Sequence, residues 1–242
     1  MSSLSLQTAP SLTELLNTLT KYPRVLFLTT SNRWGGEKGG ELPKSTWLAY
    51  ELQRHLEPGQ ATVIEVPKLV IHPCEGNVST ARGNTCGEQK AILADNAKNP
   101  SGWHRCWASV NNADDELWRV SAALFAADAV IFFGSVRWGQ ANSIYQKLIE
   151  RLTWIENRQS TLGESNIVAK IAAGAIFVGH NWRGAEVLAT QQAVLRYFGF
   201  AVQPNLCWQW QYVQDPADET PFSYAQAASA FTQTVTSQLG SA

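Results

Sequence analysis

Apolar residues occur along this chain in two patterns, short continuous runs and runs at helical spacing. Continuous or β-branched apolar runs lie at 24–30, 61–67, 128–134 and 167–179, and a fifth run follows at 200–207. Runs of this length that do not alternate with polar residues are typical of strands buried on both faces of a sheet. We therefore predict five strands. The fourth lies near the end of the run at 167–179.

The segments between these runs carry apolar residues at helical spacing. They predict helices over 44–56, 114–127, 143–155, 185–197 and 224–239, and a short helix over 12–20 that begins at a capping signal and ends before Pro23. Strands that alternate with helices predict an α/β fold, a parallel sheet with helices on both faces. In such sheets ligands bind beyond the carboxyl ends of the strands.

The regular pattern breaks down between residues 68 and 112. This segment holds turn clusters, three of the four cysteines and at most one short helix, at 88–97. It is too long for a simple connection, and long loops in compact domains are commonly lids or interfaces. We interpret it as an insertion at about 68–112 within a single domain that spans 24–242, preceded by an N-terminal extension, 1–23, with its short helix.

Three loops that follow predicted strands carry unusual chemistry. They are TTSNRWGGEKGGELPKS, GSVRWGQANS and GHNWRGAE, and they should converge on one crevice. The first combines glycines with the donors Ser31, Arg33, Lys44, Ser45 and Thr46 at the start of a helix, where free amides favour a phosphate. It is neither a P-loop nor a GxGxxG loop. On these residues alone, a merely long and polar connection is an equally good interpretation.

Composition narrows the function further. The net charge of -1 argues against a nucleic-acid partner, which would favour a basic face. No apolar run approaches the roughly 20 residues that span a bilayer, and no secretory signal is present, so we expect no membrane association and a cytoplasmic protein. The cysteines form no CxxC pair, and His72 and His104 match no metal motif, so we expect no bound metal.

Two of these segments resemble those of a known family. TTSNR followed by KST resembles the phosphate loop of the flavodoxin-like NAD(P)H-dependent FMN reductases, and 114–152 resembles the helix, strand and helix of that family. The resemblance extends from Arg24 to about Val202. It implies a flavodoxin-like three-layer sandwich, with a five-stranded parallel sheet in the order 2-1-3-4-5 and helices on both faces. Thr30 and Asn32 depart from the family's glycine and proline, and Ser135 departs from a proline.

The resemblance also implies a cofactor site. The cofactor is FMN, its phosphate is held by the first loop, and its ring lies along the second and third loops. The implied cofactor-binding residues are Ser31, Arg33, Ser45, Thr46, Ser135, Val136, Arg137, Trp138, Gly139, Gly179, His180 and Asn181. Relatives that hold iron–sulfur clusters carry a compact group of cysteines where Cys74 and Cys86 lie here. Eleven residues separate these two, so we expect no cluster.

The implied activity is electron transfer from NAD(P)H, through FMN, to a small acceptor such as a quinone, a free flavin, or a nitro or azo compound. The candidate catalytic residues are Arg137, which could place a positive charge near the ring, and His180, which follows a predicted buried strand. A solvent-exposed arginine and a structural histidine are the simpler interpretations. Trp34, Trp138 and Trp182 could form an aromatic wall or a subunit interface. We expect a homodimer or homotetramer, with the insertion helping to cover the site.

Two functions of other classes stay open. One is a flavodoxin-type electron carrier, against which the near-neutral charge argues. The other is a non-enzymatic flavodoxin-like interaction protein, for which the departures in the phosphate loop are the sole support.

Overall fold

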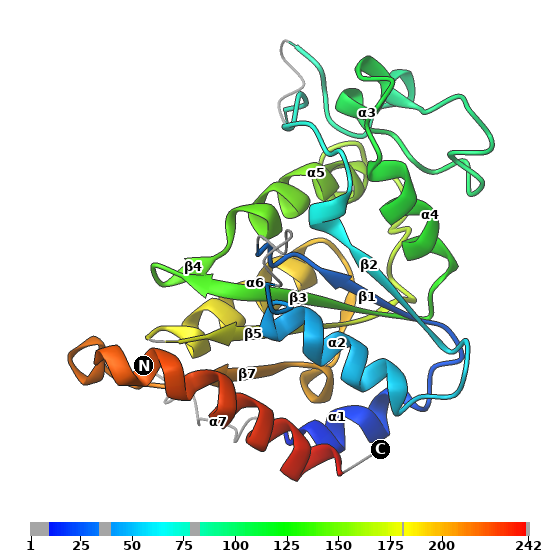
Figure 1. Cartoon of the computed structure of the whole chain (residues 1–242). Helices are drawn as coiled ribbons and strands as arrows, with labels where there is room; N and C mark the ends of the chain where they lie inside the picture. The colour runs from blue at the N-terminus through cyan, green and yellow to red at the C-terminus, as the bar shows by residue number, and fades with distance from the viewer. Residues whose placement is uncertain (1–9, 34–39, 78–82, 181, 241–242) are drawn as a thin grey trace, which may run out of the picture.

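A twisted, mostly parallel sheet forms the centre of the computed structural model, which describes residues 10–33, 40–77, 83–180 and 182–240 (Figure 1). Its principal strands are β1 (Val25–Thr29), β2 (Ala61–Glu65), β3 (Ala129–Arg137) and β5 (Ala172–Gly179). They are neighbours in the order β2-β1-β3-β5, and both β6 (Ala201–Val202) and β7 (Trp208–Gln211) pair with β5. This is the predicted strand order.

The central strands are buried on both faces, which explains their continuous apolar sequences. Every residue of β1 and of β5 is buried. Val25 pairs with Ala61 on one side and with Ala129 on the other, so β1 lies between two parallel neighbours. In a strand covered on both faces, an apolar side chain at every position stabilises the fold, because every side chain is removed from water.

Helices cover the two faces of the sheet as two outer layers (Figure 1). One layer contains α1 (Leu12–Leu19), α2 (Lys44–Arg54) and α7 (Pro221–Leu239), which pack on Phe27 and Phe133. The other contains α4 (Leu117–Ala126), α5 (Ser143–Ser160) and α6 (Gly184–Tyr197), which pack on Phe132 and Phe177. The result is the predicted three-layer flavodoxin-like arrangement. None of the described helices is long and apolar enough to span a bilayer.

The sheet has seven strands in the described part of the chain, not the five we predicted. The predicted last strand at 200–207 is divided, because Pro204 cannot donate to a ladder and begins the turn η3 (Pro204–Leu206). This turn crosses β5 at Gly174, where a Cβ would lie 2.0 Å from the Leu206 carbonyl oxygen. Strand pairing resumes at β7. The additional strand β4 (Gln140–Ala141) forms a hairpin with β3.

The insertion at 68–112 packs beside α4 and α5, away from the sheet (Figure 1). Its described regular elements are η1 (Val66–Lys68) at its start, η2 (Gln89–Ala91) and α3 (Trp107–Asn111). The predicted helix over 88–97 was wrong and is reduced to η2. The chain turns instead at Asn99, whose side chain donates to the Leu93 carbonyl and accepts from the His104 amide.

Candidate functional site

The three chemically unusual loops meet in one pocket at the carboxyl ends of β1, β3 and β5. The pocket has a volume of about 380 Å³, within the range of small-molecule sites. Its lining residues come from these loops, from β7 and from α7. They are Ser31, Asn32, Arg33, Pro43, Lys44, Ser45, Ser135, Val136, Arg137, Trp138, Val178, Gly179, His180, Trp182, Trp210, Tyr224 and Ala227.

Hydroxyl groups gather where β1 ends and α2 begins. The Ser31 and Ser45 hydroxyl oxygens lie 2.6 Å apart, and both side chains are buried. Helix α2 follows Pro43 without a side-chain cap, so its first amides have no partner within the helix. Behind them, the buried Thr46 hydroxyl has no hydrogen-bond partner among the described residues. Donors of this kind, at the start of a helix, suit an anion.

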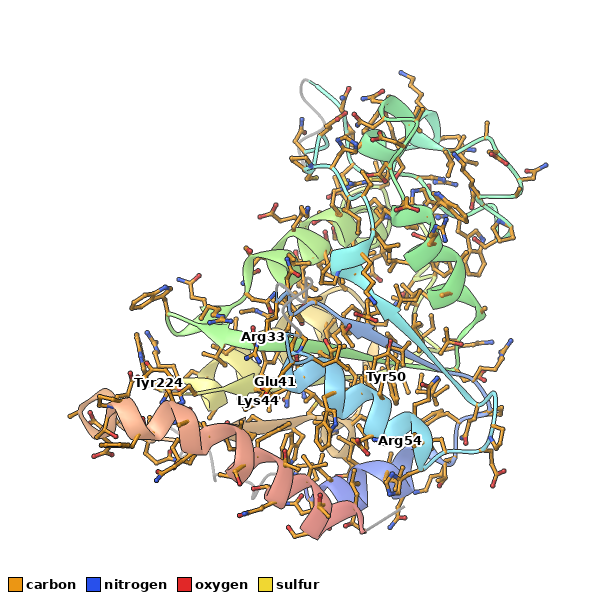
Figure 2. The ribbon with its side chains drawn as sticks, viewed as in Figure 1. Arg33, Glu41, Lys44, Tyr50, Arg54 and Tyr224 are labelled. Atoms are coloured by element: carbon orange, nitrogen blue, oxygen red, sulfur yellow. The ribbon has the colours of Figure 1, made fainter. Side chains whose placement is uncertain are left out.

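Positive charge accompanies these donors. Arg33, Glu41 and Lys44 lie together at the start of α2 (Figure 2), and Arg33 contacts Glu41 at 3.4 Å. Burial lowers the pKa of Lys44, and the charge of Arg33 lowers it further, while Glu41 opposes this. A bound anion would stabilise the charged form of Lys44, so this end of the pocket favours a phosphate or carboxylate.

Asn142 ties the first loop to the second. Its side-chain amide donates to the Thr30 carbonyl at 2.9 Å, and its side-chain oxygen accepts from the Ser135 amide at 2.9 Å. Thr30 is fully buried, and both its amide and its hydroxyl donate to the Phe133 carbonyl. The departure from glycine at position 30 therefore has a structural reason, since a glycine would lack the hydroxyl.

The second loop is a hairpin and not an irregular connection. Arg137 pairs with Gln140, and the turn between them places Trp138 and Gly139 at positive φ, 52° and 69°. A Cβ on Gly139 would lie 2.9 Å from the side chains of Trp182 and Arg183, so the hairpin tip packs on the third loop. Trp138 is 89% exposed at the rim of the pocket.

His180 lines the pocket from the third loop. Its ring stacks on Tyr224 with centroids 4.0 Å apart, and its Nε2 lies 3.3 Å from the Ser223 hydroxyl. Burial lowers the pKa of His180, with Lys44 acting in the same direction and Glu219 against it. The imidazole is therefore mainly neutral at pH 7, and a neutral ring can accept as well as donate a hydrogen bond.

Nine of the twelve residues implied by the resemblance line this pocket. Thr46 lies behind the lining, Gly139 packs on the third loop, and Asn181 lies outside the described residues, as does Trp34. No described residue of the insertion lines the pocket of its own chain, so the expected cover from the insertion is not observed there. The contacts of these residues with a flavin stay a prediction.

Sequence reasoning missed the contribution of β7 and α7, namely Trp210, Tyr224 and Ala227. A signal was present, because WQWQ at 208–211 alternates and directly follows the last predicted strand, at 200–207. The carboxyl end of a strand beside β5 must reach the same edge of the sheet.

Comparison with known proteins gives a fold but no close relative. No protein-family profile and no curated protein matches the chain. Among solved structures it is similar to RosB with the bound intermediate 8-demethyl-8-formylriboflavin-5'-phosphate, with a TM-score of 0.54 and 15% identity over 89% of this chain and 75% of RosB.

Two further structures are similar at lower scores. An azoreductase from Bacillus anthracis has a TM-score of 0.46 and 12% identity over 89% of this chain and 94% of its own. The NAD(P)H:(acceptor) oxidoreductase FerB from Paracoccus denitrificans has a TM-score of 0.44 and 11% identity over 89% of this chain and 95% of its own. Together with the strand order, the similarity to RosB shows a flavodoxin-like fold.

Proposed function

We propose that this pocket binds FMN and that the protein transfers electrons from NAD(P)H to a small acceptor. One observation carries the proposal. A single pocket joins a cationic, hydroxyl-lined end at the start of α2 to a wall that contains Trp182 and Trp210. FMN has the same two parts, a phosphate and a flat ring, and aromatic walls with a few placed polar groups are typical of sites for such ligands.

The chemistry of the first end fits a phosphate. Ser31, Ser45, Arg33 and Lys44 would hold it, together with the first amides of α2. Burial disfavours the charged form of Lys44, and the first amides of α2 have no side-chain cap, so a phosphate would compensate both.

The ring would lie between the second and third loops. Ser135, Val136, Arg137 and Trp138 of the second loop line the pocket, as do Gly179 and His180 at the start of the third. RosB, whose chain is similar in fold, holds a bound riboflavin-5'-phosphate derivative, and this supports a flavin phosphate as the ligand here.

When bound, FMN supplies the redox chemistry, accepting a hydride and returning electrons to an acceptor. The side chains of the pocket then need only to bind and orient the cofactor and its substrates and to exclude water. Arg137, exposed at the rim of the pocket, can contact the phosphates of a nicotinamide donor. His180 is held by Ser223 and Tyr224 and can exchange a hydrogen bond with the ring edge. No general base is required of the protein.

An absorption spectrum of the purified protein tests this function. We expect bound yellow FMN, either as purified or after addition, that loses its colour under anaerobic conditions when NADPH or NADH is added, and regains it with a quinone. Bound FMN that neither nucleotide reduces would contradict a reductase and favour an electron carrier. Failure to bind FMN at all would contradict both and favour an interaction protein.

A further inference from the structure

Backbone hydrogen bonds join Asn77, which follows Cys74, to the described residues Asn84 and Cys86. The Cys86 amide donates to the Asn77 carbonyl at 2.7 Å, and the Asn77 amide donates to the Asn84 carbonyl at 2.9 Å. A Cβ built on Gly76 would lie 3.2 Å from both the Cβ and the Sγ of Cys86, so the chain after Cys74 packs directly on Cys86. The Cys74 Sγ lies 3.8 Å from the Gly76 carbonyl oxygen, on the same stretch of chain that contacts Cys86, and each thiol shifts the pKa of the other. The fold thus pairs two cysteines that eleven residues separate in the sequence.

The two thiols differ in access and in acidity. Cys74 is partly exposed, whereas Cys86 is buried. A hydrogen bond from Cys86 lowers the pKa of Cys74; burial and Glu150 oppose this, and the charge of Arg151 assists it. The same hydrogen bond, together with burial, raises the pKa of Cys86. Cys74 is therefore the accessible thiolate, and Cys86 is the thiol that keeps its proton.

A third cysteine, Cys106, lies near this pair but is engaged by a cation. Its Sγ lies 3.3 Å from the Arg151 guanidinium, which is itself fully buried against Asp115. A metal ion on the same sulfur would be repelled by the guanidinium. In the described ranges no three His, Cys, Asp or Glu side chains are arranged to hold a metal. The available chemistry is that of a dithiol.

We propose that Cys74 and Cys86 form a redox-active pair that a hydroperoxide oxidises to an intramolecular disulfide. All four cysteines are free thiols in this structure. The proposal rests on the insertion and is independent of FMN binding.

The oxidation has two balanced steps. In the first step the Cys74 thiolate attacks hydrogen peroxide, so that an S–O bond forms and the O–O bond breaks. The hydroxide released takes up a proton and leaves as water. The sulfur loses two electrons, and the peroxide gains them. The Cys86 sulfur then attacks the sulfenic acid. An S–S bond forms, the S–O bond breaks, and the hydroxyl leaves as water with the Cys86 proton. In sum, two thiols and one peroxide give a disulfide and two waters.

Peptide mapping of the whole chain tests the proposal. Reduced protein is treated with hydrogen peroxide, remaining thiols are blocked with N-ethylmaleimide, and tryptic peptides are analysed without reductant. Because trypsin cleaves after Arg82, the Cys74 and Cys86 peptides should appear linked, with the mass of two hydrogens lost, and dithiothreitol should separate them. A disulfide to another cysteine, or two alkylated thiols after treatment, would overturn it.

Three variants separate the roles of the thiols. In Cys86→Ala we expect Cys74 to stop at a sulfenic acid that dimedone traps, and in Cys74→Ala we expect no oxidation of Cys86 over the same time. Cys207→Ala is the matched control, since Cys207 is buried elsewhere in the core and should leave the disulfide unchanged. In the wild type, Cys74 should be consumed at least ~10-fold faster than Cys207; equal rates would contradict the assignment, even if a variant fails to fold.

Discussion

Lys44 is the residue at which a phosphate would change the electrostatics of the pocket most directly. It is half-buried, and its pKa is lowered by burial and by Arg33. We expect Lys44→Ala to weaken FMN binding by roughly 10- to 100-fold, since a charged hydrogen bond contributes about 1.5–3 kcal/mol. Riboflavin, which has no phosphate, should bind the variant and the wild type alike. Isothermal titration calorimetry with both ligands measures the difference.

Arg54→Ala provides the control for this charge removal. Arg54 lies at the opposite end of the same helix, paired with Glu51 and away from the pocket (Figure 2). Its loss should leave both affinities unchanged. An equal loss of riboflavin affinity in Lys44→Ala would contradict a phosphate contact for Lys44.

His104 makes the stability of the protein sensitive to mild acid. It is buried beside Trp154, with Nδ1 2.7 Å from the Ser121 hydroxyl. Burial lowers its pKa to about 4; Arg151 adds to this and Asp115 opposes it. As the pH falls from about 6.5 to 4, the unfolded chain binds a proton that the folded chain does not, so the free energy of unfolding falls by about 3 kcal/mol.

His104→Asn should remove this part of the pH dependence. Urea unfolding of both proteins between pH 7 and 4.5 measures it. The variant starts from a lower stability, so the slope against pH and not the absolute value is compared. An unchanged slope would assign the acid sensitivity to the carboxylates.

At the scale of the elements, the Arg151–Asp115 pair joins α5 to the segment before α4. Both side chains are fully buried, and Arg151 also donates to the His72 carbonyl at 2.6 Å, which fastens the start of the insertion. Burial alone would raise the pKa of Asp115, but hydrogen bonds and charge from Arg151 lower it to about 2. The carboxyl of Asp115 therefore stays ionised well below the pH at which an ordinary aspartate takes up its proton.

Breaking this pair on one side should be costly. We expect Arg151→Met to lower the free energy of unfolding by about 3–5 kcal/mol, because the Asp115 carboxylate would stay buried without its partner. The double variant with Asp115→Asn should recover part of the loss. Arg119→Met, which removes an exposed pair with Glu116, should change stability by no more than about 1 kcal/mol. Equal losses for Arg151 and Arg119, measured by urea unfolding, would contradict a structural role for the buried pair.

The elements that local sequence determines are those that we predicted correctly. The runs at 24–30 and 128–134 became strands because both of their faces are covered, which apolar composition reports directly. The division of the last strand depends on the contact between Gly174 and the Leu206 carbonyl, which no local pattern shows. The hairpin after β3 was missed since its turn requires positive φ at Trp138, a residue that gives no such signal.

At the scale of the whole molecule, the convergence of the loops followed from one topological rule. Parallel strands place their carboxyl ends at the same edge, so Ser31, Ser135 and His180 meet although they are far apart in sequence. The role of α7 could not be predicted in the same way. The position of Tyr224 depends on how α7 packs across the sheet, which long-range contacts determine.

The exposed aromatic rim of the pocket predicts self-association. Trp138 and Tyr224 line the pocket and are 89% and 57% exposed, and large apolar side chains at a rim favour a protein partner. We expect sedimentation equilibrium to give at least twice the 26.7 kDa chain mass. Trp138→Ser should shift the equilibrium toward the monomer. A wild-type monomer at micromolar concentration would contradict this expectation.

The tryptophans that line the pocket would also report the binding of a flavin through their fluorescence. Three of the ten tryptophans, Trp138, Trp182 and Trp210, line it, while Trp154 and Trp208 lie in the core. Indole emission falls where flavins absorb, so a flavin beside these rings would quench their light by energy transfer. Occupancy could then be followed in unlabelled protein. A colourless compound that displaces the flavin would restore the emission. Tryptophan fluorescence could therefore be used to screen for ligands of the site.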